Sequence, residues 1–198
     1  MQQHDKKLEQ TLIDIAIKIC KQKKGCLLII ENNKFDYSPL IPQDVKPFSV
    51  FENMRRLEPL AMFDGGCVFS PDGMLIAYAV QVLNSKPIGY GGLRHQASYA
   101  ASMNNNIAIM SSEEDQKVRV FQNGKLILQI DALEKNIETK THEAVSILES
   151  VGVGTLSAVG VAILVPAIAI SLIPGILVFG SAHYSFKWIG QLLDRNKK

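Results

Sequence analysis

The chain has little net charge, few cysteines and no cysteine motif of the kind that binds metals. Its 198 residues hold 21 Lys and Arg against 19 Asp and Glu, a net charge of +2, and no basic stripe stands out. Nucleic acid is therefore not an expected partner. The three cysteines (Cys20, Cys26 and Cys67) are scattered in apolar surroundings without a CxxC. Because the histidines are also far apart in sequence, we predict neither a zinc site nor a disulfide framework, and small buried thiols suit a reducing compartment.

Charge is absent altogether from a long stretch near the C-terminus. Residues 151–182 contain 32 consecutive residues without an ionisable group, whereas one membrane-spanning helix needs about 20 apolar residues. Glycines and prolines interrupt the run, as is common in membrane helices, and Tyr184 and Trp188 would suit a membrane interface. We therefore predict a membrane contact through residues 151–188, as a single transmembrane helix or a helical hairpin. The alternative is a hydrophobic helix that packs on the core of a soluble domain.

The remaining pattern indicates a mixed α/β domain in which helices cover a central β-sheet. Apolar residues at helical spacing predict a first helix within residues 1–24 that stops before Gly25. Strands are predicted at residues 26–30, 67–69, 74–82, 106–110, 117–122 and 125–130. Asn123-Gly124 is the strongest hairpin-turn signal. Further helices are predicted at residues 50–56, at residues 94–103, and from Asp131. Asp131 would be the N-cap of this last helix, and Glu134, three residues later, would complete a capping box.

Two short motifs carry side chains that suit nucleotide chemistry. An Asp-Gly-Gly motif at residues 64–66 offers a carboxylate beside two glycines, where a ligand can approach the backbone closely. A Gly-Leu-Arg-His-Gln motif at residues 92–96 opens a predicted helix, whose free N–H groups and positive dipole favour phosphate. A carboxylate for a metal or a hydroxyl, facing donors for phosphate, favours nucleotidyl chemistry.

In order and spacing, these segments resemble the diadenylate cyclase domain of the DisA N-terminal type. The likeness covers about residues 25–133, and it includes residues 25–31, 64–66 and 92–98, Ser112-Glu113-Glu114 and Asn123-Gly124-Lys125-Leu126. In that family the signatures are Asp-Gly-Ala, Gly-Thr-Arg-His-Arg and Ser-Glu-Glu. The family joins two ATP molecules into cyclic di-AMP and releases two pyrophosphates. The resemblance implies a DisA_N-like nucleotide domain over residues 25–140. The charge-free run adds a linker helix, the membrane segment and a basic tail over residues 141–198, whereas membrane-bound members of the family place the anchor before the domain.

The resemblance also implies roles for individual residues. Asp64 would serve the attacking 3′-hydroxyl and, together with Glu114, a divalent cation, Mn²⁺ or Mg²⁺. Arg94 and His95 would complete the catalytic set by holding phosphate oxygens. The other implied nucleotide contacts are Gly65 and Gly66, which would leave room for ribose and base, Val82 near the adenine, and Gly92, Leu93, Gln96, Ser112 and Glu113.

One such site holds one ATP, whereas a cyclic dinucleotide needs two reciprocal attacks. Two protomers would therefore meet face to face, in a homodimer or a higher homo-oligomer with an isologous twofold interface. A membrane anchor would raise the local concentration and favour this pairing. We expect the protein at the cell membrane, with its catalytic domain in the cytoplasm.

Several positions depart from the family pattern. Gly66 stands for Ala, Leu93 for Thr and Gln96 for the second Arg, and Phe63 precedes the Asp where some members carry a metal-binding His. Leu93 lacks the hydroxyl of Thr and Gln96 lacks the guanidinium of Arg, so both changes weaken phosphate binding. The leading hypothesis is an active, membrane-anchored diadenylate cyclase. The alternative is a catalytically degenerate nucleotide-sensing module that controls a membrane-active C-terminal segment.

Overall fold

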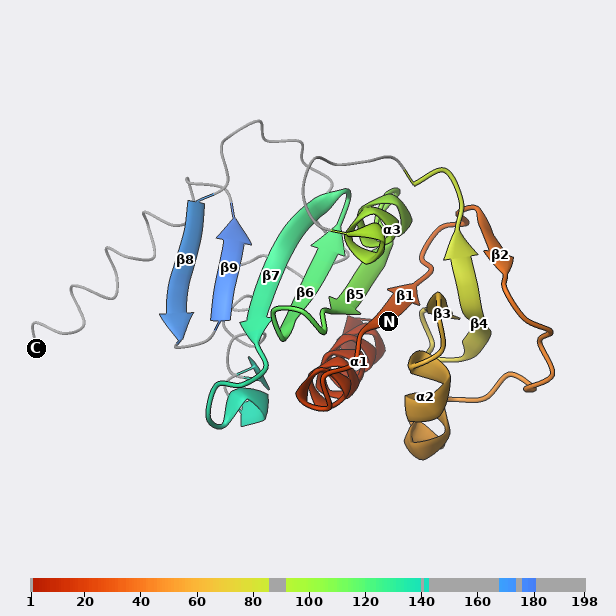
Figure 1. The fold of residues 1–198 in the computed structure, drawn as a ribbon, viewed down its shortest axis with the longest axis horizontal. Helices are drawn as coiled ribbons and strands as arrows, with labels where there is room; N and C mark the ends of the chain where they lie inside the picture. Colours follow the sequence, from red (N-terminus) through yellow and green to blue (C-terminus); the bar gives the residue numbers. More distant parts are fainter. Residues whose placement is uncertain (1, 86–91, 140, 143–167, 174–175, 181–198) are drawn as a thin grey trace, which may run out of the picture.

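A nine-stranded sheet forms the centre of the protein. The computed structural model describes residues 2–85, 92–139, 141–142, 168–173 and 176–180. The strands follow the order β2-β4-β3-β1-β5-β6-β7-β9-β8 across the sheet (Figure 1). β1 and β3 run parallel, and the other pairs within the described residues are antiparallel. The prediction of a mixed sheet with flanking helices is confirmed.

The elements follow the predicted order closely over the first two thirds of the chain. They are α1 (Gln2–Lys21), β1 (Cys26–Ile30), β2 (Tyr37–Pro39), α2 (Met54–Ala61), β3 (Gly66–Phe69), β4 (Leu75–Val82), α3 (Leu93–Ala101), β5 (Ile107–Ser111), β6 (Lys117–Gln122), β7 (Lys125–Asp131), β8 (Ile168–Ile173) and β9 (Ile176–Gly180). The short strand β2 was not predicted, because nearby prolines indicated irregular structure. It pairs only with β4 among the described strands, and Pro39 lies at its end, where a missing N–H is tolerated.

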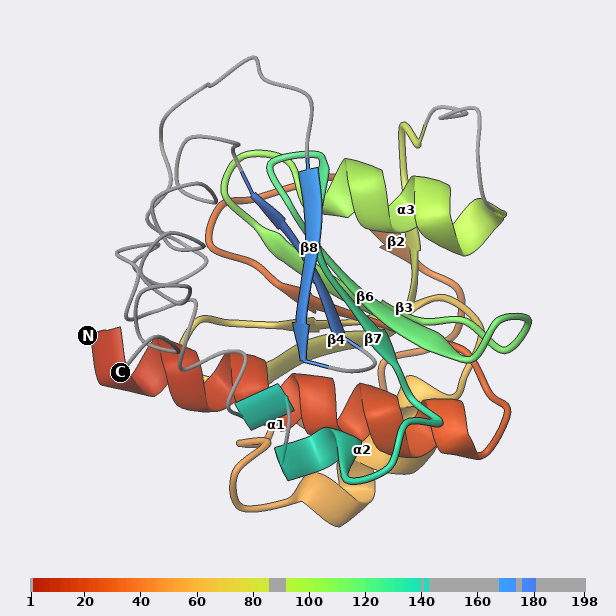
Figure 2. The same ribbon diagram turned by 90° about the vertical axis from the view of Figure 1, so that its left-hand side faces the viewer.

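Helices cover both faces of the sheet. α1 and α2 pack on one face and α3 packs on the other (Figure 2). All five residues of β1 are buried, because this strand lies in the middle of the sheet and both of its faces are covered. The three cysteines are buried free thiols, as predicted. This layering leaves the ends of the strands as the places where polar side chains can gather.

The hairpin between β6 and β7 has the predicted turn. Asn123 and Gly124 have φ angles of 49° and 65°, which are the left-handed values that a two-residue hairpin turn requires. Gln122 pairs with Lys125 across the turn. A Cβ at Gly124 would also lie 2.7 Å from Met103 Sδ. The glycine is thus needed both for backbone conformation and for the close approach of α3.

The helix predicted to start at Asp131 begins later, so that prediction is wrong. Asp131 is the last residue of β7 and pairs with Lys117 of β6. Its carboxylate accepts a hydrogen bond of 3.0 Å from the N–H of Leu133, within a turn. Helical structure starts at Ile137. The pairing of β7 with β6 extends the strand through the residue that local sequence had marked as a helix cap.

The predicted membrane helix is also wrong for part of the charge-free run. Residues 168–173 and 176–180 are the strands β8 and β9, and β9 pairs with β7. The two segments are short, rich in Ile and separated by Pro174-Gly175, a dipeptide typical of turns. Ile176 is 2% exposed and belongs to the hydrophobic core. Hydropathy alone could not distinguish this hairpin from a membrane helix.

Within the residues that the structure describes, no helix combines the length and hydropathy needed to cross a bilayer. The other parts of the predicted membrane segment, residues 151–167 and 181–188, lie outside the described residues.

Candidate functional site

The site residues that the sequence predicts gather at one edge of the sheet. Leu28 pairs with Cys67, Cys26 with Ser111, and Gly66 with Val80. This register brings together the start of β1, the start of β3 and the ends of β4 and β5. Asp64 lies just before β3, residues 112–115 lie just after β5, and α3 begins above the start of β1. Residues that are far apart in sequence therefore share one edge of the sheet.

The Asp-Gly-Gly motif forms the turn that enters β3. Asp64 is exposed, and its Oδ1 accepts a hydrogen bond of 2.9 Å from the N–H of Gly65. Gly65 has a φ of 91°, and a Cβ there would lie 2.6 Å from the carbonyl oxygen of Val80. A Cβ at Gly66 would lie 3.2 Å from Leu27 Cγ. A side chain at either glycine would therefore press against a neighbouring strand. The role of making room for ribose and base stays a prediction.

Arg94 lies on α3 directly over the backbone of Gly25. A Cβ at Gly25 would lie 2.8 Å from Nη2 of Arg94 and closer still to Cζ and Nη1. Gly25 is therefore the residue that lets the guanidinium lie against the start of β1. Among the residues that the structure describes, no carboxylate forms an ion pair with Arg94. A half-buried cation without a carboxylate partner is suited to an anionic ligand.

His95 is surrounded by charged groups from the turn that joins β5 to β6. Burial lowers the pKa of its imidazole, and the nearby Arg119 lowers it further, while Asp115 and Glu114 act in the opposite direction. The net shift is downward, so His95 is neutral at neutral pH. A neutral imidazole can donate one hydrogen bond and accept another.

Asp115 and Arg119 form an ion pair beside this histidine. Burial raises the pKa of the Asp115 carboxyl, but hydrogen bonds from Arg119 and Ser112 outweigh burial and hold the pKa below its usual value. Asp115 is therefore ionised. The sequence did not predict this ion pair. An Asp and an Arg four residues apart form no recognisable motif when a turn and a strand lie between them.

The predicted Ser-Glu-Glu segment lies in the same turn. Ser112 is 6% exposed, and its N–H donates a 3.0 Å hydrogen bond to the carbonyl of Lys117. Glu113 and Glu114 are exposed. Ser112 is thus a fixed part of the site, whereas the two glutamates are free to approach a ligand from solvent.

The start of α3 is open to solvent. Gly92 is the N-cap residue and makes no side-chain cap. Among the residues that the structure describes, apart from its chain neighbours and the helix's own backbone, no atom lies within 4 Å of the Cβ position at Gly92. Leu93 is 83% exposed, and Gln96 is half-buried on the next turn. Leu93 and Gln96, two of the departures from the family pattern, thus lie next to Arg94 and His95.

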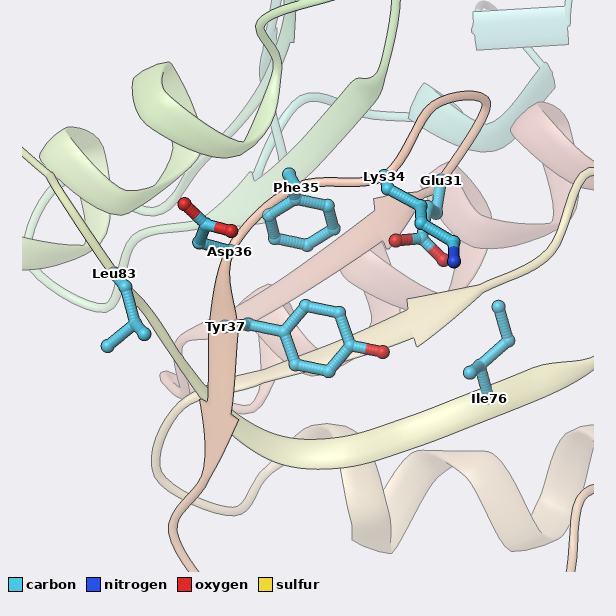
Figure 3. A pocket seen from close by; sticks show the side chains of 7 residues that line it. All are labelled: Glu31, Lys34, Phe35, Asp36, Tyr37, Ile76 and Leu83. Atoms are coloured by element: carbon cyan, nitrogen blue, oxygen red, sulfur yellow. The ribbon is translucent and has the colours of Figure 1, made fainter.

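A pocket of about 500 Å³ lies beside β2 and β4, against the segment that joins β1 to β2 (Figure 3). Its walls are Glu31, Lys34, Phe35, Asp36, Tyr37, Ile76 and Leu83. Figure 3 shows the Tyr37 ring in the centre, with Phe35 beside it; the two ring centroids are 5.0 Å apart. Burial and the nearby Glu31 raise the pKa of Tyr37, so its hydroxyl stays protonated.

This pocket is connected to the site edge through β4. Tyr37 pairs with Val82, and Leu83 donates a 2.9 Å hydrogen bond from its N–H to the carbonyl of Asp36. Val82, the predicted adenine contact, is 6% exposed in the core, whereas Leu83 is 42% exposed and lines the pocket. Val82 and Leu83 thus have different surroundings, because alternation along a strand places adjacent residues on opposite sides. The adenine contact of Val82 stays a prediction.

The predicted metal ligands are Asp64 and Glu114. No group of three or more His, Cys, Asp or Glu side chains that could hold a metal occurs in the described part of the chain. A magnesium ion that arrives with a nucleotide is usually held by one or two carboxylates, with phosphate oxygens and waters completing its shell. The carboxylates at this edge fit such a nucleotide-borne ion and do not form a complete protein cage.

The buried thiols are poor candidates for nucleophiles. Burial raises the pKa of Cys26, and burial together with the proximity of Cys26 raises the pKa of Cys20 to about 11. Both therefore stay protonated at neutral pH, and a protonated thiol is a weak nucleophile. Covalent catalysis through cysteine is not a candidate mechanism for this edge.

No protein-family model matches the chain, and no curated protein matches it. Two solved structures are similar to it. One is a hypothetical membrane spanning protein from Bacillus cereus, with 20% identity over 58% of this chain and 59% of that chain and a TM-score of 0.47. The other is a double mutant of DacA from Staphylococcus aureus, with 16% identity over 73% of this chain and 94% of that chain and a TM-score of 0.49. Both TM-scores are below 0.5, so the function proposed below rests on the residues of this chain.

Proposed function

We propose that the protein is a diadenylate cyclase, which condenses two ATP molecules into cyclic di-AMP and two pyrophosphates. The observation that carries the proposal is the meeting of Asp64, Arg94 and His95 at one sheet edge. These residues also occur in the order and spacing of the family that the sequence resembles. A carboxylate opposite a cation without a carboxylate partner is the arrangement that nucleotidyl transfer needs.

The phosphates of ATP would bind at the start of α3. The Arg94 guanidinium can neutralise charge on the α-phosphate and on the leaving pyrophosphate. The neutral His95 imidazole can donate a hydrogen bond to a phosphate oxygen, and Ser112 is close by on the Asp115 side. The open N-terminus of α3 adds backbone N–H groups and the helix dipole.

The sugar would lie near Asp64. The attacking 3′-hydroxyl must lose its proton, and the exposed Asp64 carboxylate can accept it. A Mn²⁺ or Mg²⁺ ion bound with ATP would be held by Asp64 and Glu114 and would supply charge neutralisation at the phosphates. Within the described residues, the Asp64 carboxylate accepts one hydrogen bond, from the N–H of the adjacent Gly65 to Oδ1. Its second oxygen, Oδ2, is therefore available to a ligand.

The base would lie in the pocket beside β2 and β4. Tyr37 and Leu83 offer an aromatic ring and an aliphatic side chain to a planar base. The pocket volume of about 500 Å³ lies within the usual range for small-molecule sites, about 300–1,000 Å³. In this proposal Leu83, and not Val82, would contact the adenine.

Two protomers would complete the reaction. In each half-reaction a 3′-oxygen forms a bond to the α-phosphorus of the other ATP, the bond from that phosphorus to the pyrophosphate oxygen breaks, and the hydroxyl proton moves to Asp64. Two such steps close the ring and release two pyrophosphates. The isologous pairing follows from the product, because each site binds one ATP.

The test is a product assay on the full chain with ATP and Mn²⁺ or Mg²⁺, analysed by liquid chromatography and mass spectrometry. The wild type is expected to form cyclic di-AMP. Asp64→Asn is expected to lower the rate by about 100-fold or more, because a general base contributes about 10²- to 10⁴-fold. Asp44→Asn is the matched control, since Asp44 is exposed and lies outside the site; this variant should keep full activity.

A second candidate is nucleotide sensing without turnover. The observation that favours it is the exposed Leu93 at the start of α3, which offers no donor to phosphate. Calorimetry would then show ATP or cyclic di-AMP bound tightly by a wild type that forms no product, and Asp64→Asn would bind with similar affinity.

A further inference from the structure

Arg119 lies on the same face of the sheet as α3. Its neighbours on β6, Val118 and Val120, point into the core beneath α1, so alternation along the strand turns Arg119 to the other face. There it lies close enough to lower the pKa of His95. Its side chain is only 12% exposed, which is unusual for a residue with a permanent charge.

The guanidinium is held in place by two partners. Asp115 accepts hydrogen bonds from both terminal nitrogens, with Nη1 at 3.2 Å from Oδ1 and Nη2 bound to Oδ2. Nε donates to Oε1 of Gln129 at 3.0 Å. A guanidinium has five N–H groups, and these contacts use three of them. The other two, on the terminal nitrogens, have no partner within the described residues.

The site lacks one guanidinium at the position where the sequence departs from its family. Gln96 follows Arg94 and His95 on α3 and carries no charge. The two cations that act on the imidazole of His95 are Arg119, which lies on β6, and Arg94, its neighbour on α3. Asp115 also accepts a hydrogen bond from Ser112, so one carboxylate orients both Arg119 and a predicted nucleotide contact.

We propose that Arg119 is a second phosphate-binding arginine of this site, positioned by Asp115, and that it supplies from β6 the guanidinium that Gln96 does not supply from α3. The inference rests on the proposed function and adds a specificity residue to it. Arg119 would donate its two remaining N–H groups to the β- or γ-phosphate, while its ion pair with Asp115 stays intact. The site would then prefer the triphosphate over the nucleoside.

Calorimetry on the full-length chain tests this inference, with ATP, pyrophosphate and adenosine as probes. Arg119→Gln is expected to weaken ATP and pyrophosphate binding by about tenfold to a hundredfold, the value of one or two hydrogen bonds to a charged group. Adenosine binding should change little. Arg55→Gln is the control, since Arg55 is an exposed arginine on α2, on the opposite face. It should bind all three probes as the wild type does.

Rescue separates phosphate binding from a structural role. Adding Gln96→Arg to Arg119→Gln should restore ATP affinity, because the charge returns to the same site from α3. The double variant Asp115→Asn with Arg119→Gln removes both charges of the pair, so no carboxylate is left without its partner. It keeps the test valid if Arg119→Gln alone does not fold.

Three outcomes would overturn the inference. ATP binding by Arg119→Gln equal to that of the wild type would overturn it while leaving the proposed function in place. Equal losses for ATP and adenosine, without rescue by Gln96→Arg, would show that Arg119 only supports the fold. A wild type that binds neither ATP nor pyrophosphate would overturn the proposed function and the inference together.

Discussion

Gly25 and Arg94 make the contact that holds the guanidinium against the start of β1. Gly25→Ala would place a methyl group within 2.8 Å of Nη2 of Arg94, so the guanidinium must move. We expect this variant to weaken ATP binding about as much as Arg94→Ala does. The two changes combined should cost no more than Arg94→Ala alone, because both remove the same interaction. Calorimetry of the four proteins measures this; additive losses would show that Gly25 acts elsewhere.

His95 gives the site a pH-dependent charge. Its pKa in the folded protein is below the ordinary histidine value of 6.5, whereas in the unfolded chain it should be near that value. The unfolded state therefore binds more protons in this interval, so His95 favours the folded state above pH 6.5 and this contribution is lost as the pH falls through the folded-state pKa.

An NMR titration of the His95 imidazole should thus give a midpoint below 6.5 in the free protein. Bound ATP should raise the midpoint, because nearby phosphate favours the charged imidazolium. A midpoint at or above 6.5 in the free protein would contradict the placement of His95 beside Arg119 and Arg94.

Single residues also show what sequence could and could not reveal about the site. Asp64, Arg94 and His95 could be proposed from sequence because each lies in a short motif. Arg119 and Tyr37 could not, because their surroundings depend on strands that meet only in the folded sheet. The motif also contains Gly65 and Gly66, but the approach of β4 and β1 to these glycines is recorded by no local pattern.

At the scale of elements, the hairpin β8–β9 is the least expected part of the fold. β9 extends the sheet beyond β7, and Ile176 is 2% exposed. We expect Ile176→Ala to lower the free energy of unfolding by about 2–4 kcal/mol, as other large-to-small changes in cores do. Ile41→Ala should change it by less than about 0.5 kcal/mol, since Ile41 is 39% exposed. Urea unfolding measures both; equal small effects would mean that β9 does not belong to the core.

The turn between β6 and β7 offers a second test at this scale. Gly124→Ala would force a side chain into a backbone conformation with φ of 65° and against Met103 and Tyr99. We expect a loss of about 1–3 kcal/mol in the free energy of unfolding, from strain and overpacking. Thermal unfolding would show this as a lower Tm, and an unchanged Tm would contradict the close packing of α3 on the hairpin.

Most strands and helices could be predicted because periodicity and turn residues act locally. The exceptions depend on strand pairing: β2 and β9 pair with strands that are distant in sequence, and the end of β7 pairs with the start of β6 across their hairpin. A charge-free run looks the same whether lipid or a sheet buries it. Only the pairing of β9 with β7 shows which environment these residues have.

At the scale of the whole molecule, the proposed chemistry requires two copies of the chain. A monomer that meets its partner only transiently should show a specific activity that rises with protein concentration and then levels off. Initial rates measured over a range of protein concentrations at saturating ATP test this. A specific activity that is independent of concentration, for a protein that sedimentation shows to be monomeric, would contradict reciprocal attack across two sites.

The most direct test of the account is the stoichiometry of products that the full chain forms from ATP. Reciprocal condensation predicts one cyclic di-AMP and two pyrophosphates for every two ATP consumed, with Asp64→Asn and Arg94→Ala both inactive. ATP that remains intact with the wild type, while a known diadenylate cyclase turns it over under the same conditions, would contradict it. So would a wild type that releases AMP or ADP as its main product.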